Sequence, residues 1–537
     1  MKFQETLKTL NPAKAEYHAV PKEQCAEYTR VDIRKLVAAH LSKGDRRFVW
    51  LKGSAGVGKT AIAKSLCGEL EENDRLAASF FFDKNRNQDG VDSTDRFITT
   101  LAYQLADFDS RYRQSLIRIL RTKGNILRRP LRDQLQSLII EPMREVFEGR
   151  QYDGTTHVIM LDGLDECSEK SSLDDLMDLI IGREEITGLD GLPSHFITFV
   201  GSRPVPEIRD SWQRCEKTPL IENLDDVEAE PDIRSYVIQR LTDYWRRSAA
   251  PRETAPSQHD MITFAHRCGG LFIVARIRVR EVENARRMFA EPSIDVFRRI
   301  LDDVAGSVKD LDQEYLRIFS HAYLRDTVHE DTRERFRRVM RTVLTMEEPL
   351  SAYGISQLLD EGEARVEAVL DPISSVLDIP PAKDQPVQFY HATTREFLQR
   401  RKFWEDHPEE GKLLFFSDVK GFLAPYCLDV LRKNLPRPPT PSNRTDIDAQ
   451  YFSIQARFKD TMANDTERAW NYLRYAVLYF LLHLTSGHHE AQDLLCTFLN
   501  EILLPWMIAY EPLMHNLVGR DIVNDLILCD VLMKVLV

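Results

Sequence analysis

Glycine, lysine and threonine stand at a spacing that can hold phosphate in the segment GSAGVGKT, residues 53–60. It fits the pattern G-x-x-x-x-G-K-S/T at every position. Glycines let successive backbone N–H groups point at phosphate oxygens, and the helix that follows turns its positive end toward the same oxygens. Lys59 can neutralise the β- and γ-oxygens, and the Thr60 hydroxyl can ligate Mg²⁺. The predicted nucleotide-binding set is Gly53, Ser54, Ala55, Gly56, Val57, Gly58, Lys59, Thr60 and Ala61.

Acidic and basic residues that suit the same chemistry follow two later apolar runs. VIMLDGLDEC, residues 158–167, places Asp162 at the end of a buried-strand pattern, where its carboxylate can hold Mg²⁺ through a coordinated water. Asp165 or Glu166 can polarise the attacking water. In FITFVGSRP, Arg203 follows another apolar run and can reach a γ-phosphate as a fixed cation. The predicted catalytic residues are Asp165, Glu166 and Arg203, and the metal ligands are Thr60 and Asp162.

Short apolar runs at residues 48–51, 76–84, 157–166 and 195–204 are predicted strands that would position these groups. Because amphipathic helical patterns separate them, they indicate a parallel α/β sheet covered on both faces. The strand signal fades after about residue 215, and helical periodicity follows. Between 306 and 405, three helical patterns precede two short extended pieces, which is typical of a winged-helix domain.

These patterns predict five parts in the chain. A lead-in covers residues 1–26, and an α/β nucleotide-binding domain covers 27–215. A helical domain spans 216–305, a winged-helix domain 306–405, and a second helical domain 406–537. The last contains a proline-rich loop at 434–446, because proline removes backbone donors and fixes φ.

Composition restricts the class of protein. The 537 residues carry a net charge of −12, a poor basis for a dedicated nucleic-acid binder. The eight cysteines are spread thinly without a C-x-x-C pair, which favours reduced thiols in the cytoplasm. No signal-peptide pattern begins the chain, and the longest apolar run is too short to span a bilayer.

The motifs together resemble those of fungal NACHT-domain proteins, which are STAND-class signal-transduction ATPases related to NOD-like receptors. The resemblance is carried by WLKGSAGVGKTAIAKSL, SFFFDK, TTLAYQLA, VIMLDGLDEC, TFVGSRP, GGLFIVA and FYHATTREFL. It implies an AAA+/STAND-like P-loop NTPase fold followed by helical, winged-helix and helical domains. It also implies a slow ATPase that acts as a switch in intracellular signalling, of an innate-immunity or incompatibility type. The switch would be monomeric with ADP and oligomeric with ATP.

The resemblance assigns further residues by motif. It places His391, in FYHATTREFL, on the β-phosphate of bound ADP, and makes Arg203 the sensor of the γ-phosphate. The segment CAEYTR, with Cys25, Thr29 and Arg30, resembles one that lies close to the adenine, although Tyr28 stands where the family commonly has glycine. An effector domain and sensor repeats are not visible, so we expect a minimal member or a fragment of a longer chain.

Other functions stay open from sequence alone. One is a winged-helix DNA-binding ATPase, to which the arginines of RERFRRVMR at 333–341 point, although helical spacing favours a solvated face. Another is a nucleotide-bound scaffold without hydrolysis, and a third is a P-loop kinase. His488, His489 and Cys496 lack the spacing of a metal site, so no metal beyond Mg²⁺ is expected.

Overall fold

The chain forms two compact units. The computed structural model places the first at Met1–Arg286 with Ala290–Glu314, and the second at Arg287–Phe289 with Tyr315–Val537. The structure describes residues 2–20, 23–86, 89–148, 154–167, 170–183, 187–215, 217–247, 255–302, 311–380, 385–417, 421–435, 467–485, 491–503 and 506. His488, His489 and residues 436–446 of the proline-rich segment lie outside these ranges.

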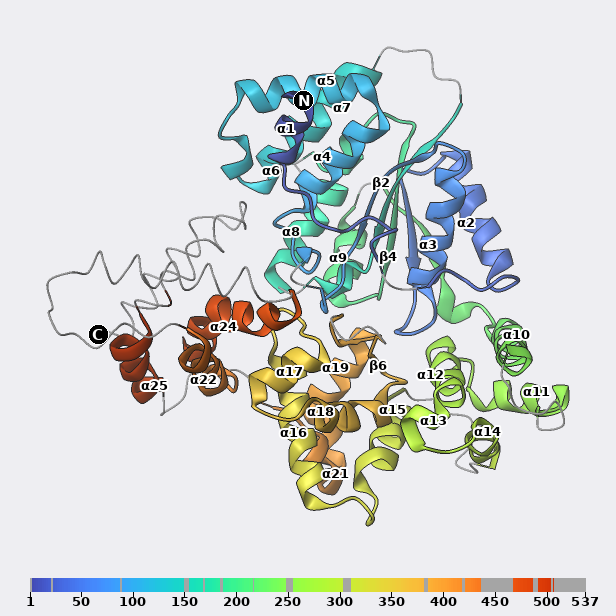
Figure 1. Cartoon of the computed structure of the whole chain (residues 1–537). Helices are drawn as coiled ribbons and strands as arrows, with labels where there is room; N and C mark the ends of the chain where they lie inside the picture. The colour runs from blue at the N-terminus through green and yellow to red at the C-terminus, as the bar shows by residue number, and fades with distance from the viewer. Residues whose placement is uncertain are drawn as a thin grey trace, which may run out of the picture. The chain divides into compact units, whose positions relative to one another are not determined.

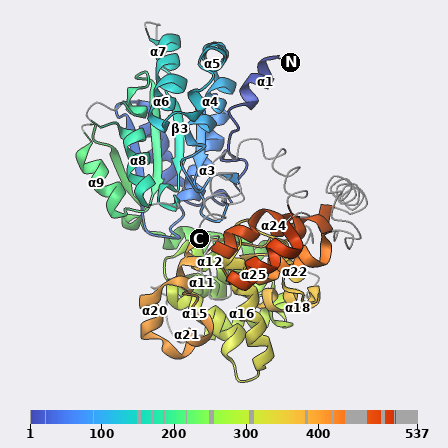
Figure 2. The ribbon, with the colours of Figure 1, turned by 90° about the vertical axis from the view of Figure 1, so that its left-hand side faces the viewer.

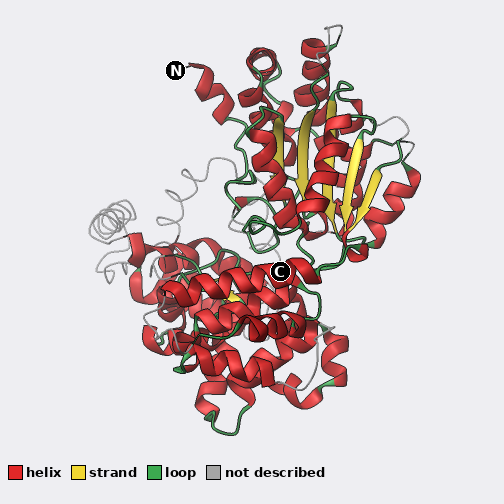
Figure 3. Ribbon diagram, turned by 90° about the vertical axis from the view of Figure 1, so that its right-hand side faces the viewer, coloured by secondary structure: helices red, strands yellow, loops and turns green. Residues whose placement is uncertain are grey.

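A parallel five-stranded sheet forms the centre of the first unit (Figures 1 and 3). The strands are β1 (Phe48–Lys52), β2 (Leu76–Phe81), β3 (His157–Asp162), β4 (Phe196–Ser202) and β5 (Leu220–Asn223). Their order is β2-β3-β4-β1-β5, so β1 lies between β4 and β5. This arrangement brings the carboxyl ends of β1, β3 and β4, which carry the predicted site residues, to one edge of the sheet.

Helices cover both faces of the sheet because successive strand residues point to opposite sides. Phe48 and Trp50 of β1 enter the core under one layer of helices, whereas Val49 and Leu51 enter the core under the other. The first layer contains α4 (Phe97–Phe108), α5 (Ser110–Thr122), α7 (Glu141–Phe147), α8 (Lys170–Ile181) and α9 (Pro206–Arg214). The second contains α2 (Val31–Lys43) and α3 (Lys59–Glu71), on the opposite side of the sheet in Figure 1.

The predicted lead-in packs against the outer strand of the sheet. It begins with α1 (Lys2–Lys8), and its extended part is tied to the unit by backbone contacts. The N–H of Phe81 donates to the carbonyl of Ala15 (3.0 Å), and the N–H of Ala13 donates to the Thr100 hydroxyl (2.8 Å). Because an outer strand has unpaired backbone groups, this segment protects β2.

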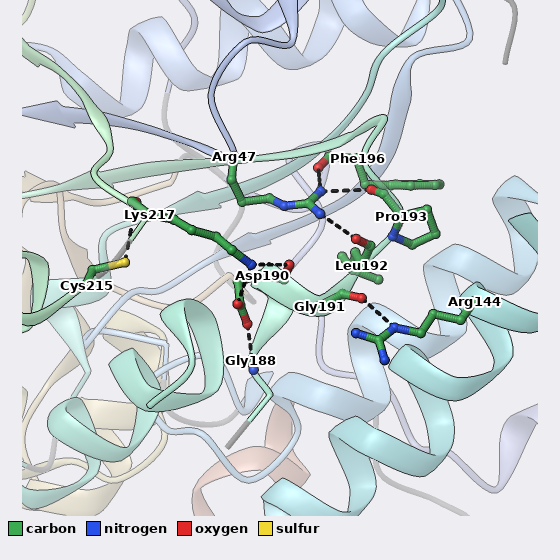
Figure 4. Close-up of polar contacts among 10 residues, drawn as sticks. All are labelled: Arg47, Arg144, Gly188, Asp190, Gly191, Leu192, Pro193, Phe196, Cys215 and Lys217. Carbon is green, nitrogen blue, oxygen red and sulfur yellow. Dashed lines mark hydrogen bonds and ion pairs between the residues drawn. The ribbon is translucent and has the colours of Figure 1, made fainter. Parts of the chain in front are cut away.

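Arg47, just before β1, fixes the segment that leads into β4 (Figure 4). Its guanidinium donates to the carbonyls of Leu192, Pro193 and Phe196, with the Pro193 bond at 2.8 Å. Burial lowers the pKa of Arg47, and the Asp190 carboxylate partly opposes this. In the same segment Arg144 donates to the Gly191 carbonyl (2.9 Å), and Lys217 pairs with Asp190 (2.7 Å). These bonds hold β4 beside β1 with Phe48 opposite Thr198.

Helices complete the first unit. They are α6 (Leu131–Gln134), α10 (Glu230–Arg247), α11 (Gln258–Arg267), α12 (Phe272–Glu283) and α14 (Ser293–Asp302). Helix α13 (Ala285–Phe289) begins in the first unit, and its last three residues, Arg287–Phe289, are grouped with the second. The first residues of α15 (Leu311–Phe319) also belong here. The helical periodicity that the sequence predicts after about residue 215 corresponds to α10, α11 and α12.

The second unit is helical apart from one small antiparallel pair, β6 (Leu377–Asp378) and β7 (Gln388–Phe389). The pair follows α16 (Glu330–Thr345), α17 (Ala352–Leu359) and α18 (Glu363–Leu370). The remaining helices are α19 (Ala392–Gln399), α20 (Arg401–Asp406), α21 (Pro408–Leu414), α22 (Ala424–Asn434), α24 (Glu467–Thr485) and α25 (Ala491–Thr497). Helix α24 lies against α22 and α25 (Figure 2).

The predicted fold class, an α/β P-loop NTPase fold followed by helical regions, is confirmed. The sheet has one strand more than the four that the sequence predicts. The additional strand is β5, which lies beyond residue 215, where the predicted α/β domain ends. It is four residues long and only partly buried, so its alternation gives a weak signal. The predicted domain limits at 26, 215, 305 and 405 stay predictions. None of the helices that the structure describes is long and apolar enough to cross a membrane.

Candidate nucleotide site

The loop between β1 and α3 has a backbone that only glycine adopts easily at two points. Gly56 has a φ of 79° and Gly58 a φ of 101°, both in the left-handed region. A Cβ at Gly58 would meet nothing within 4 Å, so this glycine leaves open space beside the first turn of α3. Lys59, Thr60 and Ala61 follow in that turn. The structure thus gathers the predicted set from 53 to 61 into one loop and one helix start.

Lys59 lies among the predicted acidic residues. Its ammonium donates to the carbonyls of Gly53 and Ser54, each at 2.8 Å. Burial lowers the pKa of Lys59, and the charges of three carboxylates oppose this effect. They are Asp165, Asp162 and Glu166, in falling order of strength. The sheet therefore brings together the lysine of one motif and the acids of another, about a hundred residues later.

Asp162 ends β3, and its side chain is only 2% exposed. A Cβ at Gly201 of β4 would lie 2.2 Å from the Asp162 Oδ1, so glycine at 201 makes room for this carboxylate. Gly163 has a φ of 74°, and a Cβ there would lie 2.7 Å from the Phe82 carbonyl oxygen. The glycine of DGLDE is thus required by both its backbone angle and its neighbour. Glycine at 163 allows the chain to turn sharply after Asp162, the predicted metal ligand.

Asp165 and Arg203 form an ion pair at the ends of β3 and β4. The backbone N–H of Arg203 donates to one carboxylate oxygen of Asp165 at 2.8 Å, and the side-chain Nε of Arg203 donates to the other at 2.5 Å. Burial acts to raise the pKa of Asp165. However, the charges of Arg203 and Lys59 and the bonds from Arg203 outweigh it and lower the pKa. Glu166, in the same short turn, is 8% exposed. An ionised carboxylate that is fully engaged by arginine is a weak base, which favours Glu166 for activating water.

Of the residues predicted to lie near the adenine, Arg30 contacts the loop itself. Arg30 is 3% exposed, and its Nη2 donates to the Val57 carbonyl at 3.0 Å. Its guanidinium carbon lies 5.0 Å from the centre of the Phe272 ring. Thr29 is buried and donates its hydroxyl within its own turn. Tyr28 has a φ of 67°, which explains why glycine suits this position.

The start of α12 is built against the loop. The Ile273 N–H donates to the Gly56 carbonyl at 3.3 Å. A Cβ at Gly56 would lie 2.4 Å from the Ile273 Cγ2, so the approach of α12 requires glycine there. With Phe272 against Arg30, the first two residues of α12 contact both the loop and the segment that precedes it. The helix is therefore positioned to respond to the shape of the loop.

Sequence reasoning missed Asp225, which bonds directly to the loop. Its carboxylate accepts from the Ser54 N–H at 2.9 and 3.1 Å and from the Ser54 hydroxyl at 3.1 Å. Asp225 follows the strand β5 that the sequence analysis also missed. The only available signal was the acidic pair in the segment IENLDD, which is common on protein surfaces.

His391 belongs to the second unit and begins α19. Its Nδ1 accepts from the Thr393 N–H at 3.3 Å and lies 2.7 Å from the Thr393 hydroxyl, which also lies 2.7 Å from the Tyr315 hydroxyl. A neutral His391 that accepts at Nδ1 carries its proton on Nε2. Its predicted contact with a β-phosphate stays a prediction.

The arginines of α16 engage groups of their own unit. Arg335 bonds to Asp331 at 2.7 Å, and Arg338 pairs with Glu361. Arg337 donates to backbone carbonyls and lies 5.3 Å from the centre of the Phe416 ring. These side chains are partly buried rather than on the solvated face expected from their spacing, and Glu361 pairs with two of them, Arg335 and Arg338. Their engagement disfavours a nucleic-acid surface here.

The site residues fit a nucleotide with magnesium. Magnesium prefers oxygen ligands and is commonly held by one hydroxyl or carboxylate together with the phosphates, which suits Thr60 and Asp162. Within the described ranges, no group of three or more His, Cys, Asp or Glu side chains is arranged to hold a metal by itself. An anionic ligand suits this place, because there is open space beside Gly58 and both Lys59 and the start of α3 carry positive charge. The sheet and the loop together define a P-loop NTPase fold.

Residues 34–192 match the family model described as "Nephrocystin 3, N-terminal". This match lies entirely within the first unit and includes the loop, Asp162 and Asp165, but not Arg203. No curated protein matches the chain.

Several solved structures are similar to the chain. The Walker-type ATPase of Pyrococcus abyssi has 10% identity and a TM-score of 0.36, over 70% of this chain and 98% of that one. The RuvB Holliday junction branch migration motor of Thermotoga maritima has 12% identity and a TM-score of 0.27, over 72% and 97%. A Drosophila ORC structure has 11% identity and a TM-score of 0.31, over 74% and 91%. Likenesses this distant carry no argument about function.

Proposed function

We propose that the protein is a nucleotide-dependent switch that binds ATP or ADP with Mg²⁺ and hydrolyses ATP slowly. The observation that carries this proposal is the Gly53–Thr60 loop, with Lys59 among the carboxylates of Asp162, Asp165 and Glu166. A lysine and a helix start suit phosphate, while the carboxylates suit the metal and the attacking water.

The residues divide the chemistry among them. Thr60 and Asp162 hold Mg²⁺, which neutralises charge on the phosphates. Glu166 orients and polarises the water, because both oxygens of Asp165 are engaged by Arg203. Asp165 fixes the Arg203 side chain at the end of β4, from which Arg203 senses the γ-phosphate. Removal of either member of this pair should therefore impair hydrolysis more than nucleotide binding.

Two observations support a switch rather than a metabolic enzyme. Helix α12 bonds to the loop through Ile273, so a change in loop shape on nucleotide exchange can move a helix outside the sheet. The helical second unit also contains His391, whose Nδ1 accepts from the Thr393 N–H at the start of α19. In the proposed cycle, ADP holds a monomer and ATP favours oligomers, which requires that the two states differ in nucleotide affinity. The resemblance of the motifs to those of NACHT proteins supports a role for this cycle in intracellular signalling.

The test begins with the nucleotide that copurifies with the full chain. The released nucleotide is identified by mass, and the oligomeric state is measured by light scattering before and after addition of Mg-ATP. We expect ADP in a monomer, and ATP in a larger assembly. Turnover measured on the same sample separates a slow ATPase from a scaffold that does not hydrolyse. Protein that neither carries nor binds nucleotide would contradict the proposal.

Variants of two lysines sharpen the test. Lys59→Ala should abolish nucleotide retention, because the phosphates lose their central cation. Lys35→Ala is the matched control, since Lys35 is exposed on α2, which does not contribute to the loop. Equal nucleotide binding by the two variants would show that the loop does not bind phosphate.

A further inference from the structure

Asp225 is placed beside the phosphate loop by the register of the sheet. Strand β5 pairs with β1 so that Asn223 lies opposite Lys52, and the short turn after β5 therefore starts next to the loop after β1. Leu224 is 1% exposed and anchors this turn. A Cβ at Gly53 would lie 3.1 Å from the Leu224 Cβ, so glycine at 53 allows the close approach.

The turn presents its two acidic side chains differently. Asp225 faces the loop and accepts the Ser54 N–H and hydroxyl at 2.9 to 3.1 Å. Asp226 instead accepts from the Asn223 side-chain amide at 2.8 Å. The Asn223 side-chain oxygen caps the turn by accepting from the Asp225 N–H at 3.4 Å. The carboxylate that touches the loop is thus oriented by its own turn.

Ser54 is consequently held on both sides. Its carbonyl accepts from the Lys59 ammonium at 2.8 Å, while its N–H and hydroxyl donate to Asp225. An incoming phosphate draws the Lys59 ammonium toward itself, whereas the bonds to Asp225 do not involve the ammonium. Asp225 therefore keeps the first turn of the loop in place while the lysine changes partners. A loop that is already ordered loses less entropy on binding.

We propose that Asp225 is a positioning residue that orders the phosphate loop through Ser54 and so speeds nucleotide capture. A carboxylate near the loop could also repel the nucleotide phosphates, and this repulsion would slow nucleotide capture. The two effects predict changes of opposite sign when Asp225 is replaced, so they can be told apart. This inference rests on the proposed nucleotide site.

The experiment measures association and dissociation rate constants for a fluorescent ATP analogue and a fluorescent ADP analogue by stopped flow, with the full chain and Mg²⁺. Asp225→Ala should lower the association rate constant about fivefold, because the loop must be ordered during binding. Asp225→Asn keeps one acceptor oxygen for the Ser54 N–H and should restore the rate to within about twofold of wild type. Ser54→Ala removes only the hydroxyl bond and should give an intermediate rate.

Asp226→Asn is the matched control, because it removes the same charge from the same turn without touching the loop. It should leave the association rate constant within about twofold of wild type. Denaturant unfolding of Asp225→Ala should match wild type, since both partners are exposed. The inference would be overturned if the association rate constant of Asp225→Ala equalled that of wild type. It would also be overturned if Asp225→Ala and Asp226→Asn both bound nucleotide faster than wild type. Neither result would contradict the proposed nucleotide site. Failure of the wild-type chain to bind nucleotide would overturn both.

Discussion

Replacement of Arg278 by methionine should destabilise the first unit strongly. Arg278 lies on α12 with 2% of its side chain exposed, and it pairs with Glu314, which is fully buried. The pair is bidentate, with Nε to Oε1 at 3.0 Å and Nη2 to Oε2 at 2.9 Å. The remaining Nη1 donates to the Arg267 carbonyl at 2.8 Å. Methionine fills the space of the aliphatic stem but removes these three hydrogen bonds and the positive charge that faces the buried Glu314 carboxylate.

The size of the effect follows from this burial. Removal of one partner of a buried, hydrogen-bonded ion pair costs about 3–5 kcal/mol. Arg276→Met is the matched control, since Arg276 lies two residues earlier on the same helix. Its bond to Glu23 at 3.3 Å is between side chains that are 28% and 50% exposed, so the loss should be within about 1 kcal/mol. The double variant Arg278→Met with Glu314→Leu should recover most of the loss, because it removes the buried carboxylate together with its cation.

Urea unfolding followed by circular dichroism and by tryptophan fluorescence gives the free energy of unfolding of each variant. Trp50, Trp212 and Trp245 report on the first unit and the other three tryptophans on the second, so the variants are compared by which part of the fluorescence transition shifts. The reasoning would be refuted if Arg278→Met cost no more than Arg276→Met. It would also be refuted if the double variant were no more stable than Arg278→Met alone.

Three further predictions concern the sheet and the site. Arg47→Ala should lower the free energy of unfolding by about 2–3 kcal/mol, because three carbonyls lose a charged donor. Urea unfolding tests this with Arg46→Ala as the control, since Arg46 is exposed, and equal stabilities of the two variants would contradict it. Gly201→Ala should displace the Asp162 carboxylate and weaken Mg²⁺-dependent hydrolysis at least tenfold, which a Mg²⁺ titration of turnover measures; unchanged magnesium dependence would show that the carboxylate tolerates the methyl group. The lowered pKa of Asp165 means that its stabilisation is complete above its unfolded value of about 4 and is lost as the pH falls through the folded value. The difference in unfolding free energy between wild type and Asp165→Asn should therefore shrink below about pH 4, and a constant difference from pH 7 to 3 would argue against the ion pair.

The sequence contained strong local signals for much of the fold. Four apolar runs marked β1 to β4, because residues buried on both faces of a parallel sheet form continuous hydrophobic segments. The loop at 53–60 was recognisable because its glycines, lysine and threonine are close in sequence. The motif DGLDE has Gly163 directly after Asp162, and the structure gives the reason, a left-handed backbone against the Phe82 carbonyl. Strand β5 gave no such signal, because it is short and only partly buried.

The sequence by itself determined that this chain has a phosphate loop, acids after a third strand and an arginine after a fourth, since each motif is local. Only the tertiary structure decided which of these groups meet. It paired Arg203 with Asp165, set Ile273 against Gly56 and brought Asp225 to Ser54. Those contacts join residues separated by tens to hundreds of positions, and strand order and register place them together. No pattern within a short window encodes such a pairing.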